Sequence, residues 1–362
     1  MEVVLGLAPI PGDLVQDDEV KRREFLRRVI AGAVGASLVP PADPLDPEPW
    51  ERLERVLARP GSIDSATLVH LDRAVTALES MEYELAPSAL IGPVRGQLDE
   101  LSRLLEGSVP TSARQQLLSL AGETAVTAGW LMWDLQRDQD VDEYWRIGRM
   151  AAQGSGDQAL MAFVLVSISF LHRKQPTKRL PILLASLRDA TPRTRAWALA
   201  AQAEAYAVAL DERECLAALD RADTTLARSS DDRSTRRPRY DPFDGTRLRG
   251  ERGAVLVKLA SHSGGRFQGR AREARTLLEQ AVSEIHGQPR MANSLRASLA
   301  RALAQLGDAD GAVQVAVEAL EGASAMGIQP TLGTLEQVLS DLEPASDSPA
   351  VRQLADRLHA IR

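Results

Sequence analysis

From about residue 49 onward, apolar residues recur three and four positions apart in segments of roughly 15 to 20 residues. Examples are "QLLSLAGETAVTAGWLMWDL" (116–135) and "LMAFVLVSISFLHR" (160–173), and breaks such as "GSVP" (107–110) and "GSGD" (154–157) separate the segments. This spacing places the apolar side chains on one face of a helix. Few stretches show the two-residue alternation of a half-buried strand. We therefore predict an all-α fold of short antiparallel helix hairpins, because such brief connections force neighbouring helices together.

Small residues repeat at fixed offsets in two of these hairpins. The spacing 0, 3, 7, 12, 16 and 19 is that of the tetratricopeptide helix-turn-helix unit, in which these positions mark where its two helices touch. The predicted repeat-packing residues are Ala300, Leu303, Gly307, Ala312, Ala316 and Ala319 in residues 298–320, and Ala203, Tyr206, Leu210, Cys215, Leu219 and Ala222 in residues 201–223. A looser third copy has Ala274, Leu278 and Ala281. We predict a tetratricopeptide-like helical-repeat solenoid, with unrelated alanine-rich amphipathic helices as the alternative.

The predicted organisation has two parts. Residues 1–48 form an N-terminal segment with a basic and apolar helix, "KRREFLRRVIAGAVGASLV" (21–39), and a linker, "PPADPLDPEP" (40–49), in which five prolines among ten residues exclude a helix. Residues 49–362 form the helical-repeat domain. Its one long interruption is a loop insertion at 229–250, which carries six arginines.

Charge and composition limit the partners. A formal net charge of −7 argues against direct binding to nucleic acid, which depends on an excess of Lys and Arg. No uncharged apolar stretch reaches the roughly 18 residues of a membrane span, so we expect no membrane partner. A single cysteine, Cys215, cannot form an intramolecular disulfide and suits a reducing compartment.

No motif in the sequence indicates a reaction. The five histidines are scattered, and none has a second ligand at a metal-binding spacing such as HExxH. No phosphate loop, dinucleotide fingerprint or nucleophile elbow occurs. We therefore expect a non-enzymatic protein with no cofactor and no metal.

Two groups of residues are candidates for binding a partner. Trp133 and Trp145 belong to an aromatic cluster that could line a groove for a peptide, because such rings give a large contact area at small entropic cost. The alternative, that this cluster is the core of one hairpin, is favoured by its apolar neighbours. In the loop insertion, Arg236, Arg237 and Tyr240 could contact an acidic partner, although nearby aspartates suit a solvated loop.

Several stretches taken in order resemble a known family. They are "LGLAPIP", "KRREFLRR", "LLSLAGETAVTAGWLMWD", "DQALMAFVLVSIS", "RAWALAAQAEAYAVAL" and "LAQLGDADGAVQVAVEAL". The chain resembles the C-terminal part of actinobacterial regulators that join a helix-turn-helix domain of the Cro/repressor type to a tetratricopeptide-like region. The resemblance implies a regulatory role in transcription or signalling. Because residues 1–20 leave no room for the DNA-binding domain, it implies the sensing half without the DNA-reading half, and it assigns no functional residue.

The sequence thus predicts a helical-repeat protein that binds a protein or peptide partner, with a homo-oligomer as a further possibility. Taken alone, Arg22 and Arg23 followed by an uncharged run fit a twin-arginine export signal, so an exported helical protein with an unidentified extracytoplasmic role is the alternative. The preceding acidic segment, the shortness of the run and Pro40 weaken that signal. A cytoplasmic location is therefore expected.

Overall fold

The computed structural model describes residues 63, 65–229, 243–261 and 268–361, all of which belong to one unit, Glu48–Arg362. This part of the chain confirms the predicted all-α class, since it contains fourteen α-helices, two short 3-10 helices and no strand. The α-helices are α3 (Ser65–Met81), α4 (Pro87–Glu106), α5 (Thr111–Asp134), α6 (Asp138–Ser155), α7 (Gln158–Ser169), α8 (Pro176–Ser186), α9 (Pro192–Val208), α10 (Glu212–Ser229), α11 (Gly245–Ser261), α12 (Gln268–Glu284), α13 (Pro289–Gln305), α14 (Ala309–Met326), α15 (Gln329–Asp341) and α16 (Pro349–Ala360). The 3-10 helices are η3 (Phe170–His172) and η4 (Glu343–Ala345).

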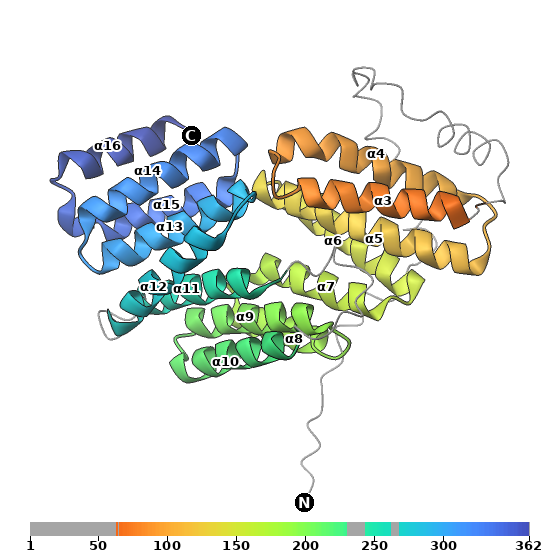
Figure 1. Ribbon diagram of the computed structural model, residues 1–362, viewed down its shortest axis with the longest axis horizontal. Helices are drawn as coiled ribbons and strands as arrows, with labels where there is room; N and C mark the ends of the chain where they lie inside the picture. Colours follow the sequence, from red (N-terminus) through yellow and green to blue (C-terminus); the bar gives the residue numbers. More distant parts are fainter. Residues whose placement is uncertain (1–62, 64, 230–242, 262–267, 362) are drawn as a thin grey trace, which may run out of the picture. The chain divides into compact units, whose positions relative to one another are not determined.

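Helices that follow one another in the chain pack side by side (Figure 1). The most extensive contacts are within the hairpins α5–α6, α9–α10, α11–α12 and α13–α14. A second set of contacts joins the first helices of successive hairpins, since α5 contacts α7, α7 contacts α9, α9 contacts α11, α11 contacts α13 and α13 contacts α15. Within the described helices, α5, α7, α9, α11, α13 and α15 therefore form one row, called here the first-helix row.

Local signals in the sequence set where the helices begin. Proline occupies the first turn of α4, α8, α9, α13, α15 and α16. It is tolerated there because the first amide groups of a helix have no partner within the helix. Aspartate caps other helices: the Asp157 carboxylate accepts from the amide of Leu160 at 2.9 Å, and that of Asp308 accepts from Gly311 at 3.0 Å.

One turn geometry recurs between the two helices of a hairpin. Gly307, after α13, has φ +81°, and the Asp308 amide donates back to the Leu303 carbonyl at 3.0 Å. At the same place after α9, Leu210 has φ +61°, and the Asp211 amide donates to the Tyr206 carbonyl at 3.0 Å. The turn after α5 repeats this pattern at Gln136, with φ +53°. A left-handed residue with this bond is a standard way to end a helix.

The predicted repeat-packing residues mostly lie in the core. Those that are fully or nearly fully buried are Ala203, Cys215, Leu219, Ala222, Ala300, Leu303, Ala312, Ala316 and Ala319. Tyr206 is half-buried against the same core. Gly307 and its counterpart Leu210 differ, because Gly307 is exposed, with nothing within 4 Å of a Cβ there, and Leu210 is 50% exposed. The role of both residues is conformational, in the turn, and their prediction as packing residues is corrected.

The interruption predicted at 229–250 is shorter at its end than expected. Helix α11 begins at Gly245, so residues 245–250 are helical. The physical reason is a cap: the Asp244 carboxylate accepts from the amide of Arg247 at 2.8 Å. Residues 230–242, which include Arg236, Arg237 and Tyr240, lie outside the described residues, as do Arg22 and Arg23.

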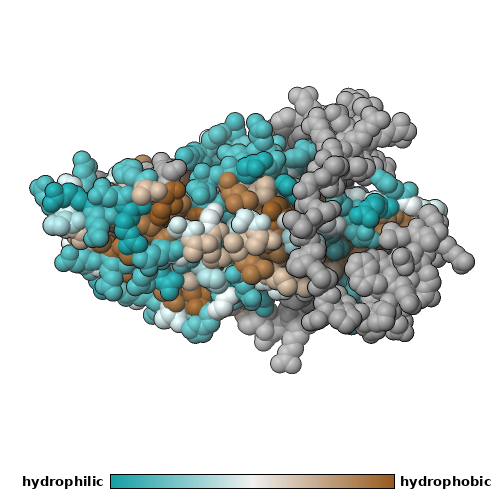
Figure 2. Space-filling model, turned by 90° about the horizontal axis from the view of Figure 1, so that it is seen from above, coloured by the Kyte–Doolittle hydropathy of each residue, from teal (hydrophilic) through white to brown (hydrophobic). Residues whose placement is uncertain are grey.

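Hydrophilic residues surround a smaller apolar area on the face seen in Figure 2, where the brown residues lie among teal ones. Within the described helices, none combines the length and the apolar character needed to cross a membrane. The buried side chains are mostly Ala and Leu, and the largest cluster runs from α9 to α16. Small residues allow these helices to approach closely, while Leu fills the spaces between them.

Candidate functional site

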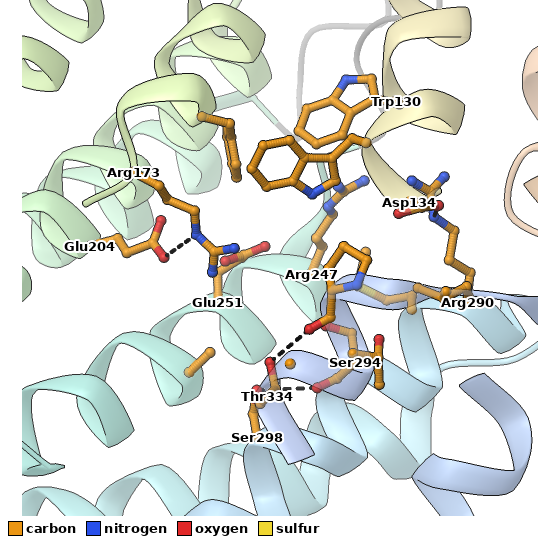
Figure 3. A pocket seen from close by; sticks show the side chains of 18 of the residues that line it. Trp130, Asp134, Arg173, Glu204, Arg247, Glu251, Arg290, Ser294, Ser298 and Thr334 are labelled. Atoms are coloured by element: carbon orange, nitrogen blue, oxygen red, sulfur yellow. Dashed lines mark hydrogen bonds and ion pairs between the residues drawn. The ribbon is translucent and has the colours of Figure 1, made fainter. Parts of the chain in front are cut away.

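One cavity of about 1060 Å³ is bordered by the first-helix row. Helices α5, α7, α9, α11, α13 and α15 all contribute side chains, and the end of α3 with the turn after it adds a further edge. Among the second helices of the described hairpins, α6 alone reaches the cavity, through Asp138 at its start. The cavity is thus a property of the row as a whole rather than of one hairpin (Figure 3).

An aromatic wall, defined as Trp130, Trp133, Phe163, Phe170 and Trp197, lines one side of the cavity. The Trp130 ring centroid lies 5.0 Å from that of Phe170 at an edge-to-face angle of 77°, and Phe163 lies 5.2 Å from Trp197. Trp130 and Trp133 are half-buried, so parts of both rings remain open to the cavity. Such rings offer a broad, rigid apolar surface to a ligand.

The two tryptophans predicted to bind a partner have different positions. Trp133 belongs to the aromatic wall, whereas Trp145, on α6, is fully buried behind it and stacks on Trp133 at 6.1 Å. The prediction that Trp145 contacts a partner is therefore corrected. Its ring is buried because Gly129 has no side chain: a Cβ there would overlap the Trp145 indole. The indole Nε1 donates to the Val126 carbonyl at 3.4 Å.

A cationic cluster, defined as Arg173, Arg179 and Lys258, surrounds the carboxylate of Glu204 at one end of the cavity. Arg179 Nη1 lies 2.7 Å from Glu204 Oε2, and Arg173 Nε donates to Oε1 at 3.2 Å. Lys258 Nζ also contacts Oε1. Burial alone would raise the pKa of Glu204, but the three cations outweigh it and hold that pKa well below its ordinary value.

Burial lowers the pKa of Lys258, whereas it would raise that of a carboxyl group. Loss of solvent, aided by the positive charge of Arg173, lowers the pKa of the ammonium to about 8, although Glu204 opposes the change. Glu251 lies two turns before Lys258 on the same face of α11 and points towards Arg173 in Figure 3. Burial, opposed by Arg247, raises the pKa of its carboxyl.

A second charged group closes the other end of the cavity. We call it the clasp and define it as Glu82, Tyr83, Asp134, Arg247 and Arg290. Arg290 lies 2.6 Å from both the Glu82 and the Asp134 carboxylates, and Arg247 donates to the Tyr83 hydroxyl at 3.3 Å. Burial, aided by the charge of Glu82, raises the pKa of Asp134 to about 6 against the opposing charge of Arg290. The clasp ties the end of α3 to α11 and α13.

Hydroxyl groups from α13 and α15 form a third side. Ser294, Ser298, Thr331 and Thr334 line the cavity. The hydroxyls of Ser298 and Thr334 donate to carbonyls of their own helices, at 3.1 and 3.2 Å, so their oxygens keep lone pairs that can accept from a ligand (Figure 3). The cavity therefore combines an apolar wall, two charged ends and neutral hydrogen-bonding groups.

The sequence alone does not reveal either charged end of the cavity. Neither Glu204 with Lys258 nor Asp134 with Arg290 has a spacing that resembles a motif, because the partners are on different hairpins. One signal was present for Glu204, which is the single acidic residue in "RAWALAAQAEAYAVAL". An acid on an alanine-rich helix that is buried nearly all round requires a buried cation.

In the described part of the chain, no three or more His, Cys, Asp and Glu side chains are grouped so that they could hold a metal ion. No known protein family matches the chain, and no curated protein matches it.

Proposed function

We propose that the chain is a non-enzymatic, tetratricopeptide-like helical-repeat protein that binds a protein or peptide segment in the cavity of the first-helix row. The proposal includes a regulatory context, in transcription or signalling, and no direct contact with nucleic acid. The observation that carries it is the cavity itself, to which six first helices contribute while their partners pack behind.

A solenoid arrangement is supported by two repeated features. Successive first helices contact one another, and the same left-handed turn follows α5, α9 and α13. Stacked helix pairs of this kind leave one face of the first helices as an extended surface for binding.

A peptide segment is supported by the mixture of groups in the cavity. Small-molecule sites commonly have volumes of about 300 to 1000 Å³, so a cavity of about 1060 Å³ accommodates something at the upper end of that range. A peptide carries amide donors, carbonyl acceptors, side chains of varied polarity and charged termini. The hydroxyls of α13 and α15, the aromatic wall and the two charged ends offer a partner to each of these.

The regulatory context rests on the resemblance to the C-terminal region of helix-turn-helix regulators. The formal net charge of −7 supports the absence of direct nucleic-acid binding, because phosphate contacts need a surplus of basic side chains.

The test is selection from a synthetic peptide library. The full chain is incubated with a pool of random peptides about ten residues long, complexes are separated by size, and bound peptides are identified by mass spectrometry. Affinities of the best binders are then measured through tryptophan fluorescence, because Trp130 and Trp133 border the cavity.

Matched variants localise the site. Ser298→Trp places an indole in the cavity and is expected to weaken binding about tenfold or more, whereas Ser324→Trp, at an exposed position on α14, leaves binding unchanged. Circular dichroism checks that both variants fold. Recovery of no peptide, equal binding by both variants, or release of cleaved peptides would each contradict the proposal.

A further inference from the structure

The cationic cluster holds more positive charge than Glu204 can neutralise. Arg179 is fully buried and takes Oε2, while Arg173 and Lys258 share the remaining oxygen, Oε1. Three cations thus meet one carboxylate. A buried surplus of charge is unfavourable unless a counter-charge accompanies it.

The guanidinium groups also have unused donors. Nε and Nη2 of Arg179 are buried and make no hydrogen bond to any described residue. Arg179 lies behind the cavity surface, with its guanidinium 5.0 Å from the Phe170 ring centroid, so it supplies charge rather than direct contact. Arg173 is different, because its side chain is 38% exposed and lines the cavity. It uses Nε for Glu204, which leaves its two Nη groups for another partner (Figure 3).

Glu251 does not fully offset the positive charge, because Arg173, Arg179 and Lys258 are three cations whereas Glu204 and Glu251 are two carboxyl groups. It lies within the field of Arg173, Arg247 and Lys258, yet burial and the neighbouring Glu204 favour its protonated form and raise its pKa. None of its oxygens forms an ion pair with a described cation. The net potential at this end of the cavity is therefore positive.

The other end of the cavity carries more acidic side chains. Glu82 and Asp134 border the cavity there, with Glu79 about one turn before Glu82 at the end of α3, and Arg290 contacts the carboxylates of Glu82 and Asp134. Figure 3 shows Asp134 and Arg290 on the side of the cavity opposite Arg173 and Glu204, with Arg247 between them. An anionic group would be repelled by the acidic end and attracted to the cationic one.

We propose that Arg173 and Lys258 form an oxyanion subsite that holds a carboxylate or phosphate group of the bound peptide, such as its free C-terminal carboxylate. This rests on the proposed function, since it takes the ligand to be a peptide. The Nη groups of Arg173 and the Lys258 ammonium donate to the oxyanion, and buried Arg179 neutralises Glu204 from behind. Charge-assisted bonds of this kind are about twice as strong as neutral ones.

The subsite has a characteristic pH dependence. Lys258 faces Arg173, which directly follows η3, as well as Arg179 on α8, Glu204 on α9 and Glu251 on its own helix. With a pKa of about 8, its ammonium is charged at neutral pH and loses its proton above that value. Binding of an anionic peptide therefore weakens as the pH rises from about 7 to about 9, because the lysine loses the charge that attracts the oxyanion.

The experiment compares three pools of the same random peptides. One has free carboxyl termini, the second has C-terminal amides and uncharged side chains, and the third is the amidated pool with one phosphoserine per peptide. Binding to the full chain is measured by competition against a fluorescent member of each pool. We expect the first or the third pool to bind about tenfold more tightly than the amidated pool, the effect typical of a hydrogen bond to a charged group. Whichever pool is preferred identifies the oxyanion as a C-terminus or a phosphate.

The variants Arg173→Gln and Lys258→Met are expected to abolish this preference, and Lys178→Gln, at an exposed position on α8 that does not line the cavity, is expected to retain it. The preference is a ratio within one protein, so it does not depend on the total amount that folds. If all three pools bind equally well, the oxyanion subsite is overturned while peptide binding stands. If none binds, the proposed function fails as well.

Discussion

Asp134 provides the sharpest test of how the clasp is stabilised. Replacing it with Asn removes the charge and keeps the shape and the carbonyl oxygen. The carboxyl has its pKa raised from an ordinary value of 3.8 to about 6, because it is buried and lies near Glu82. Ionising it in the folded protein therefore costs about 3 kcal/mol, at 1.36 kcal/mol for each pKa unit. Asp134→Asn should thus raise the free energy of unfolding at pH values above about 6.

The sign depends on pH in a defined way. The folded protein binds the Asp134 proton more tightly than the unfolded chain does, so this contribution to stability is fully present below pH 3.8 and is lost as the pH rises to about 6. Urea unfolding of both proteins, followed by circular dichroism from about pH 4 to about pH 8, measures the difference. The two curves should coincide near pH 4 and separate by up to about 3 kcal/mol at pH 8.

Loss of the ion pair between Asp134 and Arg290 would instead lower the free energy of unfolding of Asp134→Asn. Removing one partner of a buried pair typically costs about 3 to 5 kcal/mol when the remaining charge is left alone. Arg290 keeps the Glu82 carboxylate at 2.6 Å, so it does not lose its counter-charge. If Asp134→Asn is less stable than the wild type at pH 8, attraction to Arg290 outweighs desolvation and the reasoning is refuted. Asp142→Asn, at an exposed position on α6, is the control and should show no such pH dependence.

Three further predictions concern packing and backbone. Gly129→Ala should lower the free energy of unfolding by about 1 to 3 kcal/mol, because the new Cβ overlaps the Trp145 indole, and urea titration measures it. Leu210→Gly should raise that free energy by up to about 1 kcal/mol and Gly307→Leu should lower it by about 1 to 2 kcal/mol, since both residues have positive φ; equal effects of the two would contradict the turn geometry. Cys215, whose pKa is raised by burial to about 12, should resist alkylation by iodoacetamide until the protein unfolds, as mass spectrometry would show.

A glycine elsewhere gives the control for Gly129. Gly92→Ala, in the interior of α4, adds a Cβ that would meet nothing within 4 Å. It should leave stability unchanged or raise it by up to about 1 kcal/mol, because alanine is the better helix former.

The helices and their ends could be predicted from the sequence because their determinants are local. Pro192 and Pro289 begin helices and Gly156 ends one, each within a few residues of where the apolar periodicity changes. The predicted loop at 229–250 was too long at its end, because a local signal for the start of α11 was overlooked. Asp244 is an ordinary helix cap, but it lies in a stretch so rich in Arg and Asp that the whole stretch resembled a loop.

The cavity could not be predicted in the same way. Arg290 and Glu82 are 208 residues apart in the chain, and no local pattern relates them. Trp133 and Trp145 belong to one aromatic cluster, yet one borders the cavity and the other lies in the core. Trp145 occupies the space beside Gly129, where a Cβ would overlap its indole. A glycine inside a segment with a clear helical pattern indicates close packing of this kind.

The clasp has a consequence for how the chain unfolds. Arrays in which each repeat contacts only its neighbours lose their terminal repeats first, in steps of low cooperativity. Here the turn after α3 is tied to α11 and α13 through Tyr83 and Glu82. Fraying of α3 and α4 would have to expose the buried guanidinium of Arg290. Helices α3 and α4 should therefore be lost together with α13 in a single transition. Amide hydrogen exchange should therefore report similar protection for α3 and α13.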